Sequence, residues 1–252
     1  MKESNKVVVI GGGAAGMMAA GTAASLGAHV TLLEPNGKLG KKLFITGKGR
    51  CNVTNNCAGG EVLKNVPTNP RFLYGALAGF SPADAMAFFE EHGCQLKTER
   101  GNRVFPESDQ AGSVIDALRR FLKETGVEIR WERALEIKAA DGAVTGVRTQ
   151  TGRLPADRVI LATGGCSYPA TGSTGDGYRL AGSLGHTIIE PRGSLVPLVE
   201  KGHTCGAMQG LALKNVEVKL LDAKGKCVFS EFGELLFTHF GLSGPVILSA
   251  SC

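Results

Sequence analysis

The N-terminal part of the chain alternates between apolar runs and a small-residue segment of helical character. Residues 6–10 are β-branched and apolar, which is typical of a strand buried on both faces of a parallel sheet. Residues 14–26 are rich in alanine and methionine and end at Gly27, as a helix with a glycine stop does. Residues 29–33 are a second apolar run. This order predicts one strand–helix–strand unit.

Helical periodicity dominates residues 69–126, which we interpret as a helical excursion from the sheet. Ser81 begins a helix that stops at Gly93, and residues 113–124 predict a second amphipathic helix. Residues 95–105 lie between these two helices and predict a hairpin.

The pattern changes again after this excursion. Residues 127–131 predict a short strand, and residues 134–150 alternate around an Asp-Gly turn, which indicates a small antiparallel meander. Residues 159–162 predict another buried strand, and residues 176–184 predict a short helix. The fold class is therefore α/β, with a parallel central sheet and a small meander.

Alternating strands replace this pattern from Ser194 onward, which predicts a separate β-rich domain. We expect one domain over residues 1–192 and a second over residues 193–252. The last apolar run, which reaches Cys252, is interpreted as strand-like.

Composition narrows the class of protein. The chain has 252 residues with 43% hydrophobic and 20% charged content, so it can bury a substantial core. The net charge of +5 is small and its basic residues are mostly interspersed with acidic ones, which favours neither a nucleic acid nor a membrane as partner. Residues 7–33 lack charged side chains, but glycines and polar residues interrupt them, and we expect no membrane segment.

Glycine and cysteine usage adds two expectations. The 36 glycines are roughly twice the usual share, which predicts turns that bring the backbone close to another group. The seven cysteines form no Cys-x-x-Cys pair and fit neither a disulfide framework nor a zinc site. We expect reduced thiols in a cytoplasmic protein, and no metal site.

A glycine-rich turn follows the first predicted strand. Residues 11–16 match the G-x-G-x-x-G fingerprint and open the first predicted helix, where amide groups and the helix dipole attract phosphates. Glu34 ends the second predicted strand, where a carboxylate accepts hydrogen bonds from a ribose. The combination predicts a dinucleotide site, and it does not separate NAD from FAD.

A basic, glycine-rich stretch follows Glu34. Residues 37–56 show neither helical nor strand periodicity, which indicates a long functional loop with a short helical turn. Gly47, Gly49 and Arg50 combine close backbone approach with an anion-pairing side chain. A solvated basic loop is the alternative interpretation.

Three segments resemble signatures of one known family. Residues 45–55 resemble the signature of FAD-binding oxidoreductases with a glutathione-reductase-like fold, which include aminoacetone-oxidase-like and bile-acid-linked flavoproteins. Residues 162–178 resemble its second signature, and residues 239–245 resemble a third, in an inserted β-barrel domain. The likeness covers nearly the whole chain.

The resemblance implies a Rossmann-like FAD/NAD(P)-binding domain over residues 1–192 and the N-terminal part of an inserted β-barrel domain over residues 193–252. It implies these cofactor-binding residues: Gly11, Gly13, Ala14, Ala15, Gly16 and Glu34 at the ADP half, Lys41, Lys42, Gly49, Arg50, Cys51 and Asn52 further along, Ala134 at adenine, and Thr163, Gly164 and Gly165 beside the flavin. In similar proteins the acid that binds the ribityl chain lies in a C-terminal segment, so Asp176 is not assigned to it. Relative to the family, the chain is expected to be truncated at its C-terminal side.

No catalytic residue is predicted. Cys51 and Cys57 leave a redox disulfide open beside the commoner interpretation as free thiols, and Cys166 is no stronger a candidate. His239, Tyr168 and Tyr178 are each better explained by packing or hydrogen bonding, and the cofactor carries the hydride in a flavoenzyme.

The predicted function is an FAD-dependent oxidoreductase that acts on a small organic substrate by flavin-mediated hydride transfer, with NAD(P)H as a further cofactor to test as electron donor. Three alternatives remain, namely a nicotinamide-only dehydrogenase, a nucleic-acid-binding or nucleic-acid-modifying flavoprotein, and a non-catalytic fragment. The small-molecule substrate is the expected partner, and the oligomeric state is open.

Overall fold

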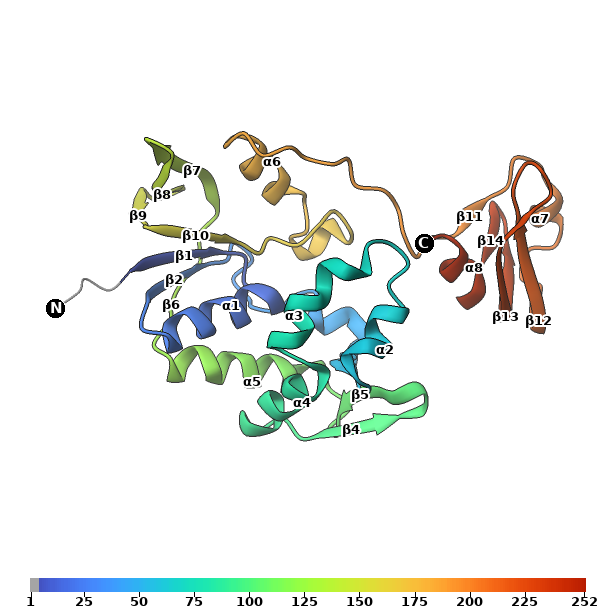
Figure 1. Cartoon of the computed structure of the whole chain (residues 1–252), viewed down its shortest axis with the longest axis horizontal. Coiled ribbons are helices and arrows are strands. Elements are labelled where there is room, and N and C mark those ends of the chain that lie inside the picture. Colours follow the sequence, from blue (N-terminus) through green and yellow to red (C-terminus); the bar gives the residue numbers. More distant parts are fainter. Residues whose placement is uncertain (1–4) are drawn as a thin grey trace. The chain divides into compact units, whose positions relative to one another are not determined.

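The computed structural model describes residues 5–252, which fall into two compact units (Figure 1). The first unit ends at Ile189 and the second comprises Glu190–Cys252, close to the predicted boundary at residue 192.

The centre of the first unit is a sheet of four parallel strands, as predicted. Its strands in spatial order are β10 (Arg158–Leu161), β1 (Lys6–Ile10), β2 (His29–Leu33) and β6 (Glu128–Arg130). The chain leaves β1 toward β2 on one side and returns to β10 on the other. The carboxyl ends of β1 and β10 therefore form the switch point at which open α/β sheets bind ligands.

The side chains of β1 alternate between two hydrophobic clusters. Val7 and Val9 pack on one face with the helices α1 (Ala14–Ser25) and α5 (Ala111–Glu124). Val8 and Ile10 belong to the cluster on the opposite face, with residues of the meander. Both clusters exclude water from β1, which explains why its sequence is apolar at every position after Lys6.

The predicted meander covers this second face (Figure 1). Its antiparallel strands are β7 (Ala134–Ala140), β8 (Ala143–Thr149) and β9 (Arg153–Pro155). The helix α6 (Asp176–Gly182) adds Leu180 to the same cluster. The 3-10 helix η4 (Pro169–Thr171) lies in the connection between β10 and α6.

The predicted helical excursion over residues 69–126 contributes two strands to a small three-stranded antiparallel sheet, whose third strand precedes it. In chain order the elements between β2 and α5 are η1 (Leu43–Gly49), β3 (Thr54–Asn55), α2 (Gly59–Lys64), η2 (Pro70–Leu73), α3 (Tyr74–Gly79), α4 (Pro82–Glu91), β4 (Leu96–Glu99), η3 (Arg100–Asn102) and β5 (Arg103–Pro106). The predicted start of α4 is confirmed, because Ser81 and Asp84 form a capping box with Pro82 in the first turn. Residues 95–105 form the predicted hairpin.

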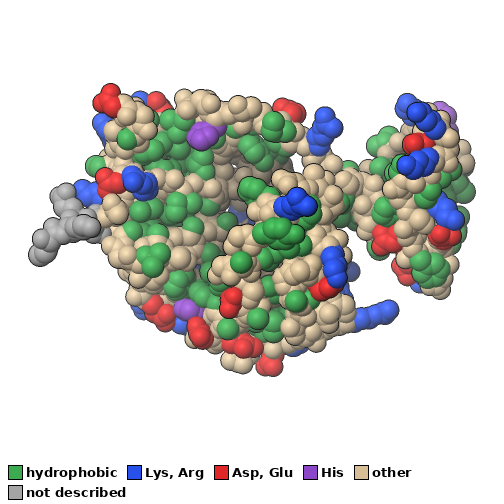
Figure 2. All heavy atoms as spheres, in the orientation of Figure 1, with side chains coloured by type: hydrophobic (Ala, Val, Ile, Leu, Met, Phe, Trp, Pro, Cys, Tyr) green, Lys and Arg blue, Asp and Glu red, His purple; other side chains and the backbone are tan. Residues whose placement is uncertain are grey.

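Hydrophobic side chains reach the surface over α3 (Figure 2). Phe72 is 81% exposed and Tyr74 is 57% exposed. Among residues 5–252, no single helix has the length and apolarity needed to cross a membrane, although the bent pair Pro70–Gly79 and Pro82–Glu91 meets both criteria together.

The second unit is a four-stranded antiparallel sheet with two short helices. Its strands in spatial order are β11 (Leu198–Val199), β14 (Gly241–Ser243), β13 (Cys227–Thr238) and β12 (Ala212–Leu221), and its helices are α7 (Thr204–Ala207) and α8 (Pro245–Ala250). The interpretation of this unit as the start of a β-barrel stays a prediction.

The helix α8 corrects the expectation that the last apolar run is strand-like. Gly244 has φ of +98°, which ends the extended backbone. Pro245 then occupies the first helical position, where a backbone N–H has no intrahelical acceptor and its absence costs no hydrogen bond. Val246 and Ile247 are buried, so the run is apolar because the helix packs on β13, with which it makes contact.

Candidate functional site

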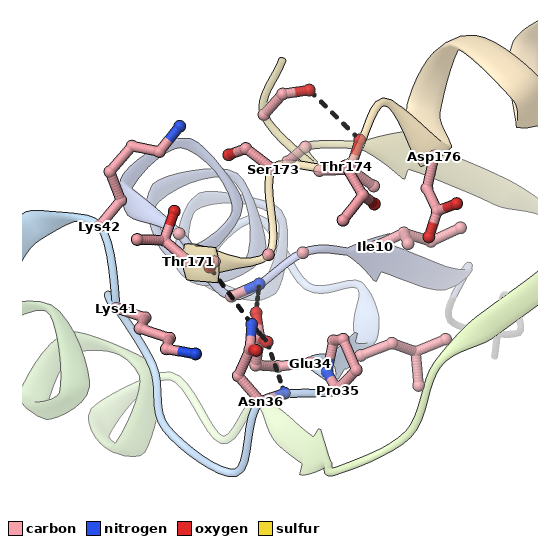
Figure 3. Close-up of a pocket in the computed structure, with 18 of the residues that line it drawn as sticks. Ile10, Glu34, Pro35, Asn36, Lys41, Lys42, Thr171, Ser173, Thr174 and Asp176 are labelled. Carbon is pink, nitrogen blue, oxygen red and sulfur yellow. Dashed lines mark hydrogen bonds between the residues drawn. The ribbon is translucent and has the colours of Figure 1, made fainter. Parts of the chain in front are cut away.

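A cavity of about 500 Å³ lies at the carboxyl ends of β1 and β2, within the size range of small-molecule sites (Figure 3). Segments from five parts of the first unit line it: the glycine turn, the end of β2, the loop before η1, the stretch from β6 to β7, and the connection after β10. The cavity lining contains these predicted cofactor-binding residues: Gly11, Gly13, Ala14, Ala15, Glu34, Lys41, Lys42, Ala134, Thr163 and Gly164.

Glycine stands at each of three fingerprint positions for a different structural reason. Gly11 has φ of +112°, and a Cβ there would lie 2.4 Å from the carbonyl oxygen of Ala162. A Cβ at Gly16 would lie 1.7 Å from the carbonyl oxygen of Gly11, so α1 approaches the turn closely only because Gly16 lacks a side chain. At Gly13 an added Cβ would meet no protein atom within 4 Å, and Gly13 lines the cavity. The turn thus leaves open space where the helix begins.

The N-terminus of α1 faces this space. Gly13 is the N-cap residue and makes no side-chain capping bond. The first amide groups of a helix have no intrahelical acceptor, and together with the helix dipole they attract anions. Lys41 and Lys42 also line the cavity, so basic side chains as well as backbone amides can contact an anion there.

Glu34 is held in one orientation at the end of β2. The N–H of Gly12 donates to its Oε2 at 2.8 Å, while the backbone N–H and side-chain Nδ2 of Asn36 donate to Oε1 at 2.8 and 2.7 Å. The residue is 6% exposed and lines the cavity. A carboxylate has about four acceptor positions, so Glu34 can still accept a bond from a ligand hydroxyl.

The loop residues Gly49, Arg50, Cys51 and Asn52 are absent from the described cavity lining. Arg50 forms ion pairs with Glu99 and with Asp109, the latter at 2.7 Å, and its guanidinium lies 4.1 Å from the ring centre of Phe105. The hydrogen bond to Glu99 raises the pKa of Arg50 above its ordinary value. In this chain the side chain of Arg50 therefore joins η1 to the small sheet.

Two further predicted residues support the lining from behind. Gly16 is buried beneath the glycine turn. The carbonyl oxygen of Gly165 accepts a hydrogen bond from the N–H of Gly175 at 3.2 Å. Neither residue appears in the described cavity lining.

The structure also brings in residues that the sequence did not single out. Asn36 donates hydrogen bonds to Glu34 and to the segment after β10. Its position two residues beyond Glu34 is the sequence feature from which it could have been predicted. Asp176, which was not assigned to the cofactor, lines the cavity and pairs with Arg133 at 3.2 Å. In the described part of the chain, no group of three or more His, Cys, Asp or Glu residues could hold a metal.

The cysteines are free thiols in the described structure. Cys51 and Cys94 are buried in one hydrophobic cluster, whereas Cys166, Cys227 and Cys252 are exposed. Burial raises the pKa of Cys51, and Cys57 is also unpaired, so the structure shows no disulfide between residues 51 and 57. A buried thiol of raised pKa is a poor nucleophile, which favours a packing role for Cys51.

Cys94 is expected to weaken the fold at alkaline pH. Burial, and to a smaller degree Cys51, raises the pKa of Cys94 from 9.0 to about 11. The thiol of Cys94 loses its proton at a lower pH in the unfolded chain than in the folded protein. Its contribution to the free energy of unfolding is therefore complete below pH 9 and is lost as the pH rises toward 11. Between these values the unfolding free energy of the natural protein should fall about 2 kcal/mol further than that of Cys94→Ala. Denaturant titrations measure the difference.

The matched control is Cys227→Ala, which removes an exposed thiol. Its unfolding free energy should decline with pH as steeply as that of the natural protein. Parallel curves for Cys94→Ala and the natural protein would contradict the pKa assignment.

Comparison with known proteins decides the family. The model of the HI0933-like protein Rossmann domain matches residues 5–244. The chain belongs to this HI0933-like family. The predicted resemblance is thereby confirmed, and the family is one of FAD-dependent oxidoreductases.

Two curated relatives of this HI0933-like chain carry different names. It is 36% identical to a 3-dehydro-bile acid delta(4,6)-reductase of Clostridium scindens, over 98% of the chain and 60% of the relative. It is 30% identical to a ribosomal RNA dihydrouridine synthase of Haemophilus influenzae, over 100% of the chain and 62% of the relative. The chain thus spans about three fifths of the length of these relatives.

Solved structures support the fold of the HI0933-like chain. A flavocytochrome c3 fumarate reductase in an open conformation has a TM-score of 0.54 at 22% identity, covering 85% of this chain and 47% of that one. The Sdh1 complex of Mycobacterium smegmatis in the apo form has a TM-score of 0.50 at 20% identity, covering 72% and 39%. At these identities the likeness concerns the fold alone.

Proposed function

We propose that the cavity binds FAD and that the protein uses it to reduce a carbon–carbon double bond conjugated to a carbonyl group in a small organic substrate. The observation that carries the proposal is the open space in front of Gly13, where a backbone turn and a helix N-terminus meet without a side chain between them. A pyrophosphate needs a site of this kind.

The residues present fit the cofactor. The amides at the start of α1 would hold the pyrophosphate, and the carboxylate of Glu34 would accept from the hydroxyls of the adenosine ribose. Lys41 and Lys42 would offset phosphate charge. Thr163 and Gly164 line the cavity at the end of β10, where the cofactor would continue toward the flavin.

When bound, FAD supplies hydride transfer, with NAD(P)H as the proposed electron donor. The chain itself binds and orients the dinucleotide. The backbone of the glycine turn approaches it closely, the bonds from Gly12 and Asn36 fix the acceptor carboxylate of Glu34, and the apolar end of β1 excludes water from one side of the cavity.

The names of both curated relatives describe the saturation of double bonds. One reduces the delta(4,6) system of a 3-dehydro bile acid, and the other makes dihydrouridine in ribosomal RNA. An oxo-diene and the uracil ring both contain an alkene conjugated to a carbonyl. Such an alkene accepts a hydride at one carbon and a proton at the other, and this shared chemistry motivates the proposed substrate class.

A nucleic-acid substrate is the second candidate, because one relative is named for ribosomal RNA. Basic residues between positions 38 and 50 could attract RNA, but three of them have separate places in the structure. Lys41 and Lys42 line the cavity, whereas Arg50 is paired with Glu99 and Asp109. We therefore rank a small conjugated carbonyl compound above RNA.

Flavin reoxidation tests the proposal. The protein, expressed to the end of its gene, is loaded with FAD, reduced anaerobically and mixed with a steroid 3-oxo-4,6-diene or with a uridine-containing ribosomal RNA fragment. We expect the steroid to restore the oxidised flavin spectrum with formation of saturated product. Reoxidation by RNA alone would support the second candidate, and reoxidation by neither, but only by oxygen, would contradict double-bond reduction.

A further inference from the structure

Asn36 connects two walls of the cavity. Its Nδ2 donates to Oε1 of Glu34 at 2.7 Å and to the carbonyl oxygen of Thr171 at 3.4 Å (Figure 3). Glu34 directly follows β2, whereas Thr171 ends η4 and lies 135 residues beyond Asn36. Both partners are acceptors, so only the nitrogen of the amide can face them. We call Asn36 with Glu34, Thr171 and Gly172 the Asn36 clasp.

The contact at the clasp is close. Gly172 has φ of +102°, and a Cβ there would lie 2.5 Å from Nδ2 of Asn36. The preceding turn is held from within, because the N–H and the hydroxyl of Thr171 both donate to the carbonyl oxygen of Tyr168, at 2.9 and 2.7 Å. Asn36 therefore meets an ordered turn.

A second bridge secures the other end of the same segment. Nζ of Lys42 donates to the carbonyl oxygen of Ser167 at 2.9 Å. Residues 167–172 are thus attached at both ends to the stretch that follows β2. Residues 169 and 171–174 belong to the cavity lining, so the two bridges determine where this wall stands.

We propose that Asn36 is a positioning residue for the bound dinucleotide. It fixes the carboxylate of Glu34 in the orientation that meets the ribose, and it holds residues 167–172 as the wall of the cavity beside the adenosine half. This inference rests on the proposed binding of FAD. It adds a role for a side chain outside the fingerprint, and it explains why the residue at position 36 must offer a donor to two acceptors at once.

The first test compares ligand affinity. In Asn36→Ala, Glu34 loses a side-chain partner and the wall loses a tether, so the dissociation constants of FAD and of ADP should both rise about tenfold, which corresponds to about 1.4 kcal/mol. Asn56→Ala is the matched control, because its amide donates to Thr98 Oγ1 at 3.1 Å on the exposed small sheet. The control should bind both ligands as the natural protein does.

The variant Asn36→Asp distinguishes a role as hydrogen-bond donor from a role in packing, because only the former predicts a pH dependence. The substitution would place a second carboxylate against Glu34, and the introduced carboxyl group would donate again once it is protonated. The other charged groups of the cavity lining are Lys41, Lys42, Glu132, Arg133 and Asp176. Relative to the natural protein, FAD affinity of this variant should improve as the pH falls from about 8 to about 5. An unchanged ratio across this range would contradict the donor role.

Amide hydrogen exchange without any ligand tests the wall directly. Residues 167–174 should exchange faster in Asn36→Ala than in the natural protein, whereas the strands of the central sheet should not change. Gly172→Ala should have a similar effect, because its methyl would displace Asn36. The loss of exchange protection in the double variant should be smaller than the sum of the losses in the two single variants. The methyl group at position 172 then no longer meets the side chain of Asn36.

The outcomes separate the two proposals. If the natural protein binds neither FAD nor ADP, the proposed function fails while the exchange experiment still tests the clasp. If it binds both, and Asn36→Ala binds both equally well with unchanged exchange in residues 167–174, the clasp has no positioning role.

Discussion

Gly13→Val is expected to abolish FAD binding while the protein stays folded. Gly13 has φ of −81° and ψ of −174°, which valine adopts without strain. An added Cβ meets no protein atom within 4 Å, so the fold tolerates the side chain. The same side chain would project into the space in front of α1, where the pyrophosphate must approach the backbone.

Two measurements test whether Gly13→Val stays folded and whether it loses FAD binding. Thermal unfolding followed by circular dichroism should match the natural protein without ligand, and equilibrium dialysis should show FAD affinity at least about a hundredfold weaker, or about 2.7 kcal/mol. A folded variant that keeps the FAD stoichiometry of the natural protein would show that the glycine turn does not face the cofactor.

Gly16→Ala is expected to destabilise the protein itself. Its Cβ would lie 1.7 Å from the carbonyl oxygen of Gly11, and that oxygen belongs to backbone that cannot rotate away. The helix α1 would have to move off β1, whose residues Val7 and Val9 pack in the same cluster as Met17. Overpacking of this kind costs about 3 kcal/mol. Chemical denaturation without ligand measures the loss.

Gly75→Ala is the matched control for this substitution. Gly75 lies in α3 and an added Cβ there meets nothing within 4 Å, so alanine should be neutral or should stabilise by about 0.5 kcal/mol through helix propensity. If Gly16→Ala were as stable as Gly75→Ala, the close approach of α1 to the turn would be wrong.

The fingerprint glycines illustrate how far the sequence predicts the site. The spacing of Gly11, Gly13 and Gly16, between an apolar run and an alanine-rich helix, was sufficient because Gly11 and Gly16 meet close backbone contacts and Gly13 leaves the space before the helix open. The parallel sheet was predictable for a similar reason, since β1 is buried on both faces and leaves a continuous apolar run.

Other features depend on contacts between distant segments. Arg50 has the same sequence context whether it meets a phosphate or the carboxylates of Glu99 and Asp109, which lie 49 and 59 residues away. The bond from Asn36 to Thr171 spans 135 residues. Periodicity carries no information on such pairs.

The wrong expectation near the end of the chain has a local cause. Residues 246–248 are apolar and β-branched or leucine, so they favour a strand by propensity. The preceding Gly244-Pro245 pair starts a helix instead, and short apolar runs do not separate the two states by periodicity.

The visible absorption spectrum tests the central claim most directly. The chain, and the protein expressed to the end of its gene, are each mixed with FAD, desalted and scanned, with Gly13→Val treated in parallel. We predict that the protein expressed to the end of its gene keeps a two-band flavin spectrum with one FAD per chain, and that Gly13→Val is colourless. Colourless preparations of both would contradict the assignment of the cavity to FAD.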